Sequence, residues 1–155
     1  MPVGNVGPRL LVVGGLVWLA PARVLVHRRS TGAAFGAGMI ELPGGKVEPG
    51  EPPAAALARE LVEEWGTGAR MLVVGPIADV LHHMYRPSGP EVVLLVYHVD
   101  ARGWGDAWAD HVESEPGVVP LAFLVRDLPV EQFLAADLEF AGAVARGVVR
   151  CPFAS

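Results

Sequence analysis

Short runs of valine, leucine and isoleucine, separated by turn-forming residues, recur along the chain and predict a strand-rich domain. The runs PRLLVVGGLVWLAPA and RVLVHRRS near the N-terminus meet at a Pro-Ala pair, which favours two strands joined by a tight turn. IELP begins a short strand that leads into the glycine-rich turn GGKVEPGE. Three later runs also predict strands, and they cover residues 70–84, 91–99 and 118–125. The segment RPSGP predicts the turn that would pair 70–84 with 91–99.

Two stretches have helical rather than strand character. Residues 52–65 predict a helix because Pro52 and Pro53 suit a first turn and Gly66 suits the stop. Its apolar side, which we expect to pack on the sheet, would carry Ala54, Leu57, Ala58, Leu61 and Trp65. A closing amphipathic helix is predicted by apolar residues at helical spacing, namely Leu134, Leu138, Ala141, Ala145 and Val148.

The order of these elements predicts an α/β fold. Strands that alternate with two helices favour a mixed β-sheet covered by a helix on each face. The length of 155 residues fits a single domain, 1–155, and neither a repeat nor a linker is evident. The N-terminal apolar run also has features of a secretory signal, but it is too short to span a bilayer and continues as a strand would. We interpret it as a strand.

Composition and charge narrow the function classes. The formal net charge is −5 and no long basic run is present, so we expect neither nucleic acid nor a membrane as a partner. A small anionic substrate would need local positive charge or a metal ion. Cys151 is the only cysteine, which excludes an intramolecular disulfide and favours a reducing, cytoplasmic location.

Three glutamates in the first predicted helix are the strongest chemical signal. Glu60, Glu63 and Glu64 are spaced i, i+3 and i+4, so they share one helix face. A divalent cation would relieve their mutual repulsion, and carboxylates without cysteine or clustered histidine suit Mg²⁺, or Mn²⁺, rather than zinc. The five histidines lack zinc-site spacing and are expected to pack in the core or lie at the surface. A solvated acidic helix face is the alternative to a metal site.

The surrounding residues favour the metal site, because they match a known signature. The sequence resembles Gly-x5-Glu-x7-Arg-Glu-U-x-Glu-Glu-x-Gly-U of the Nudix hydrolases, in which U is a bulky apolar residue. The fixed positions are filled by Gly45, Glu51, Arg59, Glu60, Glu63, Glu64 and Gly66, with Leu61 at the first apolar position. Thr67 is the one departure, at the last apolar position. The resemblance implies the Nudix α/β/α sandwich.

The resemblance also implies roles for these residues. Glu60, Glu63 and Glu64 would be metal ligands, with the Gly44 carbonyl as an additional one. Glu51 and Arg59 would form a supporting salt bridge, and Gly44 and Gly45 would permit the tight turn.

The implied reaction is attack of water on one phosphorus of a nucleoside diphosphate linked to another group, X. A general base is required. The catalytic candidates are Glu64 and Glu63 on the helix and Glu113 on a later loop, with Glu115 as a substitute for Glu113.

Several residues outside the signature are candidates for substrate contacts. Arg28 and Arg29 end a predicted strand, and because neighbouring side chains alternate, at most one of them would face the site. Lys46 is the only lysine and lies in the signature loop. Asp137 approaches the closing helix, where some relatives place base-reading side chains. Trp104 and Trp108 could stack on a base or pack in a lid.

The resemblance favours the branch of MutT-like nucleotide pyrophosphohydrolases, which convert (deoxy)nucleoside triphosphates, including oxidised ones, to monophosphate and pyrophosphate. Tyr85, which lies 18 residues after Thr67, favours dinucleoside polyphosphates instead. Hydrolysis of ADP-ribose or nucleotide sugars is a further alternative, although Pro76 and Pro87 are poorly spaced for it. A binding regulator without turnover is the least favoured, because every signature glutamate and the arginine are present. The protein would act on a small nucleotide as a monomer or homodimer.

Overall fold

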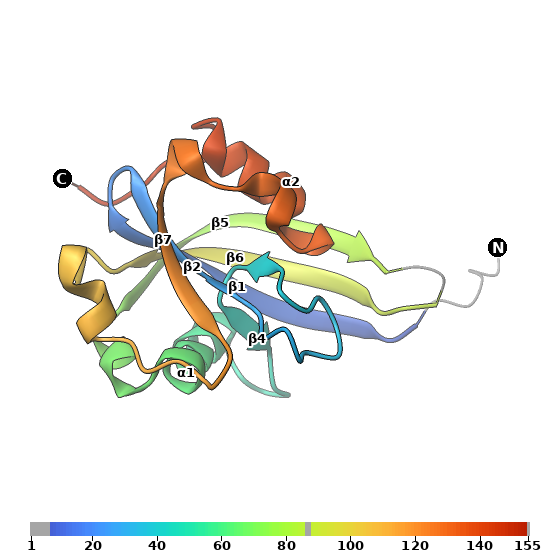
Figure 1. Cartoon of the computed structure of the whole chain (residues 1–155). Coiled ribbons are helices and arrows are strands. Elements are labelled where there is room, and N and C mark those ends of the chain that lie inside the picture. Colours follow the sequence, from blue (N-terminus) through green and yellow to red (C-terminus); the bar gives the residue numbers. More distant parts are fainter. Residues whose placement is uncertain (1–6, 86–87, 155) are drawn as a thin grey trace.

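The central strand β1 (Arg9–Ala20) organises the sheet. The computed structural model describes residues 7–85 and 88–154. In this part of the chain, one seven-stranded sheet has the order β3-β2-β1-β6-β5, while β4 pairs with β1 and β7 with β2 (Figure 1). β1 and β6 run parallel and the other pairs are antiparallel, so the sheet is mixed, as predicted. The remaining strands are β2 (Arg23–Arg28), β3 (Ile40–Glu41), β4 (Gly44–Lys46), β5 (Val73–Met84), β6 (Glu91–Asp100) and β7 (Val119–Leu124).

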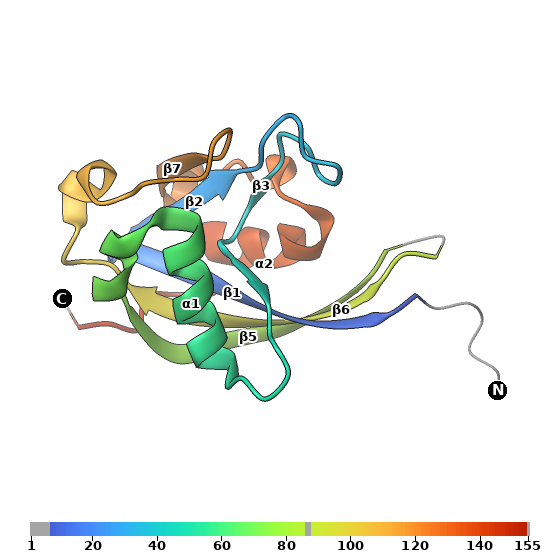
Figure 2. The ribbon, with the colours of Figure 1, turned by 90° about the horizontal axis from the view of Figure 1, so that it is seen from below.

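A helix covers each face of this sheet (Figure 2). α1 (Pro53–Trp65) packs on one face and α2 (Ala135–Ala145) on the other. Alternate residues of β1 therefore enter different clusters: Val13 and Val17 pack with α1, whereas Leu16 and Trp18 pack on the α2 side. All four are buried because both faces are covered, which explains the continuous apolar sequence of this strand.

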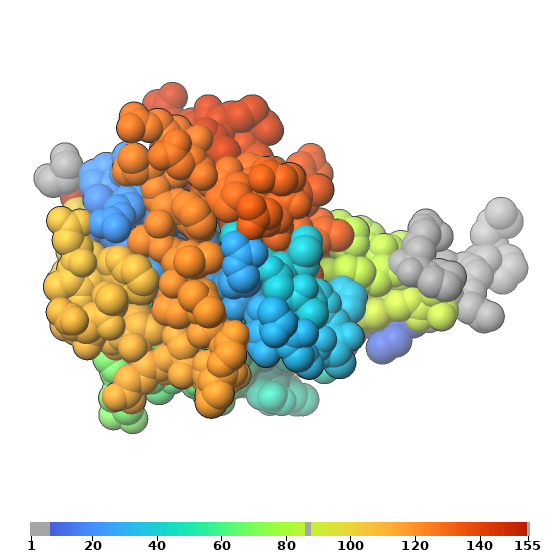
Figure 3. Space-filling model, in the orientation of Figure 1, coloured from blue at the N-terminus to red at the C-terminus, as the bar shows by residue number. Residues whose placement is uncertain are grey.

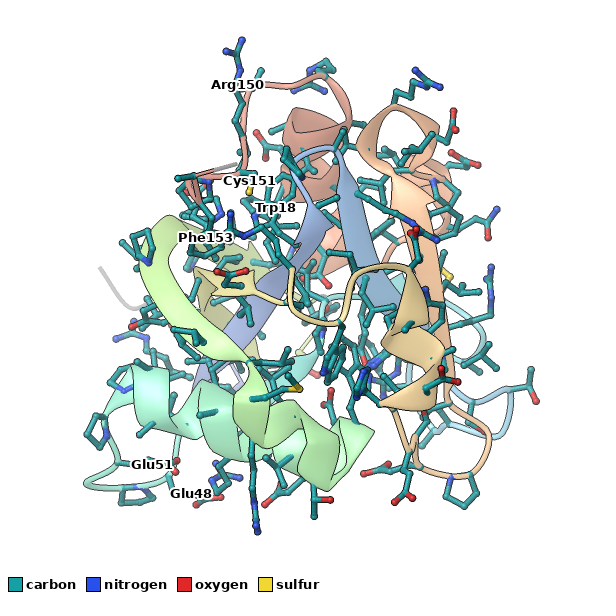
Figure 4. The ribbon with its side chains drawn as sticks, turned by 90° about the vertical axis from the view of Figure 1, so that its left-hand side faces the viewer. Trp18, Glu48, Glu51, Arg150, Cys151 and Phe153 are labelled. Atoms are coloured by element: carbon teal, nitrogen blue, oxygen red, sulfur yellow. The ribbon has the colours of Figure 1, made fainter. Side chains whose placement is uncertain are left out.

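Short 3₁₀ helices and a C-terminal segment complete the layers. The 3₁₀ helices are η1 (Thr67–Met71), η2 (Gly105–Asp110), η3 (Val125–Asp127) and η4 (Val130–Gln132). The C-terminal segment places Cys151 and Phe153 against the cluster that contains Trp18 (Figure 4). Among the described residues, no helix is long and apolar enough to cross a membrane.

The strand predictions are largely confirmed. Pro21 and Ala22 turn the chain between β1 and β2, and β5 and β6 form the predicted antiparallel pair. Of the predicted turn RPSGP, Arg86 and Pro87 lie outside the described residues. The segment between β6 and β7 contains the helix η2.

The predicted apolar face of α1 was partly wrong. Leu57, Leu61 and Trp65 are buried as expected. Ala54 and Ala58 are exposed, and Ala56 is buried in their place. The buried stripe therefore keeps its three large predicted side chains, and only the alanine that accompanies them differs.

The predicted face of the closing helix was partly wrong, although Leu134 and Ala141 are buried as expected. α2 ends at Ala145, so Val148 lies beyond it and is exposed, as is Leu138. The buried face is formed by Asp137, Phe140, Ala141 and Val144. Apolar periodicity misplaced this face because one of its buried positions holds a carboxylate, which accepts a hydrogen bond from the Leu42 amide at 3.1 Å.

Candidate active site

The loop Gly44–Glu51 folds back on the polar face of α1. β4 pairs Gly44 with Gly14 and Gly45 with Val13, which holds the loop against β1. A Cβ atom on Gly45 would collide with the Glu60 carboxylate, and one on Gly44 would collide with the Val13 carbonyl. The Gly44 amide donates to the Glu64 carboxylate at 3.3 Å. Both glycines are therefore needed for the close approach of backbone and carboxylates.

Arg59 holds the two ends of this loop on the helix. Its Nε and Nη2 donate to the two Glu51 carboxylate oxygens at 2.8 and 2.9 Å, which is the predicted ion pair. Nη2 also donates to the Lys46 carbonyl at 3.1 Å, and Nη1 reaches Glu60 at 3.0 Å and Glu63 at 3.2 Å. Arg59 therefore joins the start of the loop, its end and the acidic helix face. The guanidinium lowers the pKa of Glu51 to about 2.

Two adjoining cavities lie beside the helix and the loop. An acidic cavity of about 280 Å³ is lined by His27, Arg29, Glu41, Glu60, Glu64 and Glu115 among others. An apolar cavity of about 490 Å³ is lined by residues of β1, β4, β6 and the start of α2, which includes Asp137, and by Phe35 and Tyr85 among others. Arg29, Glu41 and Glu64 line both cavities and therefore form the boundary between them.

Several carboxylates lie close together in the acidic cavity, and their negative charges repel one another. Burial, together with the nearby charges of Glu41 and Glu60, raises the pKa of Glu64 to about 9. Burial also raises the pKa of Glu60. These carboxylates lie close together with few cations beside them, since Arg29 binds Glu41 and Arg59 binds Glu51, Glu60 and Glu63. The cavity is an environment that favours an added positive charge.

Comparisons with known proteins agree with the geometry of this loop and helix. The family model described as the NUDIX domain matches residues 8–138. The chain belongs to the Nudix family.

Among its relatives, an uncharacterized Nudix hydrolase of Rhodococcus erythropolis is 41% identical over 93 residues, 51% of this chain and 50% of the relative. A Mycobacterium tuberculosis protein named provisionally as 8-oxo-dGTP diphosphatase 2 is 62% identical over 67 residues, 43% of this chain and 45% of the relative. The matches thus span about half the length of these curated relatives. The crystal structure of a MutT protein from Methanosarcina mazei has a TM-score of 0.70, with 25% identity, over 92% of this chain and 96% of that one.

Nudix hydrolases generally use divalent metals, and the residues of this signature fit such an ion. Oxygen donors converge on the acidic cavity, and the raised pKa of Glu64 reflects its burial together with neighbouring negative charge, both of which a bound cation would offset. The carboxylates do not form a closed cage: the described residues include no group of three or more acidic, histidine or cysteine side chains with metal-site spacing. A hard cation that retains water ligands suits this arrangement.

The Nudix helix places its three glutamates differently. Glu60 and Glu64 line the acidic cavity. The Glu63 side chain is 53% exposed and paired with Arg59, so it stands at the rim rather than among the cavity-lining residues.

Arg28, the last residue of β2, and Arg29, which follows it, also point to different places, in agreement with the predicted alternation. Arg29 lines both cavities and donates to both Glu41 oxygens, at 3.1 and 3.2 Å. Arg28 binds the Gly38 carbonyl and the Gln132 side chain, both at 2.9 Å, and is not among the residues that line either cavity. The structure therefore leaves Arg29 as the substrate-contact candidate.

The loop before β7 contributes Glu115, not Glu113, to the acidic cavity. The Glu113 amide donates to the Trp65 carbonyl at 2.8 Å, which fixes that residue at the end of α1 beside Gly66. Gly117 packs against Ser30, so the loop lies along the segment that follows β2 (Figure 3). Of the two candidates that the sequence offered on this loop, the alternative, Glu115, is the one that lines the cavity, because loop spacing alone does not fix which side chain turns inward.

The other predicted substrate contacts meet at the apolar cavity. Lys46, Tyr85 and Asp137 all line it, although they come from β4, the position directly after β5 and the first turn of α2. Burial raises the pKa of Asp137 to about 7. Trp104, in contrast, is buried against Trp65 and stacked on His111, so it serves the core rather than a base.

Sequence reasoning missed two residues of the site, His27 and Glu41. His27 was expected to be a packing or surface residue, yet it lines the acidic cavity and binds Glu41 at 3.0 Å. Glu41, from the strand IELP, lies at the boundary of the two cavities. Its position directly before the signature loop was the one signal in the sequence that could have indicated it.

Proposed function

We propose that the protein hydrolyses a nucleoside diphosphate linked to X, most simply a (deoxy)nucleoside triphosphate, to nucleoside monophosphate and pyrophosphate. The observation that carries this proposal is the adjacency of the two cavities. The acidic cavity suits a metal-bound phosphate chain, and the apolar cavity suits a nucleoside. Arg29, at their boundary, supplies positive charge where the two parts of such a substrate would join.

Glu60, Glu63, Glu64 and the Gly44 carbonyl would hold Mg²⁺, with Mn²⁺ as a substitute. When bound, the ion would neutralise phosphate charge and lower the pKa of a coordinated water. Arg59 keeps the Gly44–Glu51 loop and the helix glutamates together, and Arg29 binds and orients the phosphate chain. Positioning and electrostatic stabilisation supply most of the rate enhancement in phosphoryl transfer, which agrees with a site built from charged groups.

Glu115 is our candidate for the general base. It lines the acidic cavity together with Glu60 and Glu64, and its charge contributes to the raised pKa of Glu64. A water oxygen would form the new bond to phosphorus, and its proton would pass to the Glu115 carboxylate. The bond from phosphorus to the bridging oxygen would break, and the departing phosphate would take the electron pair. Glu64 remains a ligand in this scheme.

The apolar cavity would select the base. Asp137 accepts the Leu42 amide through one carboxylate oxygen, and the side chain lines the cavity. With a pKa near 7 this carboxyl is present in both protonation states near neutral pH, so it can accept or donate a hydrogen bond to a base edge. The name of the Mycobacterium tuberculosis relative supports oxidised guanine nucleotides as the first substrates to test.

One observation favours a second substrate class. Tyr85 lines the apolar cavity, with its ring 4.9 Å from Phe35 in an edge-to-face contact. A pair of aromatic rings beside the nucleoside position would suit a second base and therefore a dinucleoside polyphosphate.

A product assay tests these proposals. Purified protein with Mg²⁺ or Mn²⁺, with and without EDTA, would be offered canonical and oxidised nucleoside triphosphates, diadenosine polyphosphates, ADP-ribose and nucleotide sugars. We expect EDTA-sensitive release of monophosphate and pyrophosphate from the triphosphates, resolved by anion-exchange chromatography. Two mononucleotides released from a diadenosine polyphosphate would establish the second class. Binding of nucleotides without turnover of any panel member would refute the hydrolase proposal and support a binding role.

A further inference from the structure

A chain of side-chain hydrogen bonds runs from the end of the Nudix helix to the boundary between the two cavities. Trp65 Nε1 donates to His27 Nδ1 at 3.2 Å. His27 Nε2 lies 3.0 Å from Glu41 Oε1. Arg29 Nη1 then donates to both Glu41 oxygens. The chain connects α1, β2 and β3, and His27 at its centre is 2% exposed.

The indole determines which imidazole nitrogen carries the proton. A tryptophan N–H can only donate, so His27 Nδ1 must act as the acceptor and carry no hydrogen. The proton therefore lies on Nε2, where it donates to the Glu41 carboxylate. Glu64 Oε2 lies 3.8 Å from Nδ1, which is too far for a hydrogen bond, so Glu64 does not compete with the indole.

We propose that His27 is a positioning residue, which holds Glu41, and through Glu41 the guanidinium of Arg29, at the boundary between the acidic and apolar cavities. The inference rests on the proposed function, in which the phosphate chain of the substrate crosses this boundary. A carboxylate held only by Arg29 could rotate with it, whereas a second donor from a buried ring fixes the carboxylate plane. The guanidinium of Arg29 is then ordered before the substrate binds, so binding does not carry the entropic cost of ordering that side chain.

The protein contains a second tryptophan–histidine pair that provides an internal control. Trp18 Nε1 donates to His98 Nδ1 at 2.9 Å, and His98 is 7% exposed. This pair lies beside Phe153 on the α2 side of the sheet and is not among the residues that line either cavity. It has the same donor and acceptor atoms without the carboxylate and arginine beyond them.

Two substitutions at His27 separate its hydrogen bond to Glu41 from its hydrogen bond to Trp65. His27→Gln places an amide N–H near the position of Nε2 and so keeps a donor for Glu41. His27→Asn places an amide oxygen near Nδ1 and so keeps only the acceptor for Trp65. We expect His27→Asn to raise KM roughly tenfold, the size expected for loss of a hydrogen bond to a charged group, with a much smaller change in kcat. His27→Gln should recover most of this loss.

The same two substitutions at His98 measure the purely structural cost. They should lower the Tm, as those at His27 do, but leave KM unchanged. Equal KM values for His27→Asn and His27→Gln, whether both normal or both raised, would overturn the proposal.

The tautomer of His27, measured by NMR, tests this chain of hydrogen bonds without an activity assay. In protein with ¹⁵N-labelled histidine, the His27 resonances, assigned by their loss in His27→Gln, should show a protonated Nε2 and an unprotonated Nδ1. Trp65→Phe removes the indole donor and should weaken this preference, which the Glu41 carboxylate alone would then maintain. The opposite tautomer in the wild-type protein would overturn the proposal. If the wild-type protein hydrolyses no nucleotide in the panel, the proposed function fails, while the tautomer and the affinity for α,β-methylene-dGTP, measured by calorimetry on the same variants, still decide the role of His27.

Discussion

The two cavities are built from the chain in different ways. The acidic cavity takes Glu60 and Glu64 from one helix, and the loop that supports them lies directly before that helix. The apolar cavity collects side chains from strands β1 and β6, from the loop that contains Phe35 and from the start of α2. The position of the helix glutamates therefore depends on spacing along the chain, whereas the rest of the acidic cavity and most of the apolar cavity depend on how the sheet brings distant segments together.

Under the proposed function, this difference separates the part of the site that would perform the chemistry from the part that would select the substrate. The helix carboxylates stay in place as long as the spacing between the loop and the helix in the sequence is kept. The residues that line the apolar cavity come from separate segments, and each segment can change independently. Arg29, Glu41 and Glu64 belong to both cavities and couple the two parts. Substitutions should therefore fall into two groups, those that lower kcat and those that alter substrate choice or stability.

Glu64→Gln should have the largest effect. It removes a proposed metal ligand and should lower kcat by roughly a thousandfold. In EDTA the same variant should be more stable than the wild type above neutral pH. The folded-state pKa of Glu64 is raised from 4.5 to about 9, so the metal-free wild type loses stability as pH rises between these values. Steady-state kinetics and thermal melts would check both results, with Glu139→Gln on α2 as the control. Full activity would refute the ligand role.

Glu115→Gln should lower kcat by about a hundredfold if Glu115 is the base. Glu113→Gln is a matched control on the same loop and should remain within about twofold of the wild type, because Glu113 faces the end of α1. The pH–rate profile should lose its acidic limb in Glu115→Gln only. The reverse pattern for the two variants would restore Glu113 as the base.

Arg59→Ala should lower kcat by roughly tenfold or more, since it frees the Gly44–Glu51 loop without removing a ligand. The loop should become more sensitive to protease, with Arg70→Ala, which changes an exposed arginine on η1, as the control. The Glu51 pair stabilises the wild type above about pH 4.5, and this stabilisation is lost as pH falls toward 2. Arg59→Ala should therefore show a shallower acid transition, and unchanged protease resistance would contradict the supporting role.

Asp137→Asn should have the smallest effect on turnover and should act on base choice and stability. The amide oxygen can still accept the Leu42 N–H. Because burial raises the folded-state pKa of Asp137 from 3.8 to about 7, the wild type loses stability as pH rises between those values. Asn removes this loss, so urea melts in EDTA should show the variant gaining stability relative to the wild type at pH 8 but not at pH 3. The exposed Asp127→Asn should show no such difference, and the ratio of KM values for two bases should change only in Asp137→Asn.

Local spacing explains why much of the fold was predictable. α1 begins one residue after its predicted start and ends as predicted, because prolines and a glycine mark its ends. The full buried face of α2 was not predictable from apolar periodicity, because it includes Asp137. The carboxylate of this buried residue accepts a hydrogen bond from the Leu42 amide, 95 residues away in the sequence. That contact exists only once α2 lies on β3 and its following residues.

The site follows the same division. The Glu51–Arg59 pair and the shared face of Glu60 and Glu64 depend on spacing within one loop and helix, and the sequence predicted both. The choice of Glu115 over Glu113 and the placing of His27 beside Glu41 depend on how β2, β3 and the loop before β7 meet. A sequence pattern contains no distances between such segments, so those positions became evident only in three dimensions.

The parallel pairing of β1 with β6 also has a consequence for the order in which the protein matures. Arg9 pairs with Glu91 and Trp18 with Asp100, so β1 can pair with β6 only after more than half the length of the chain has been added beyond β1. A ribosome that adds about 5–20 residues per second needs several seconds to synthesise that interval. α1 emerges during it, before the strand that supplies Val99 to its packing surface. The acidic cavity therefore cannot form on the nascent chain until β6 and then Glu115 have been synthesised, so synthesis of the last third of the chain sets when the site first exists.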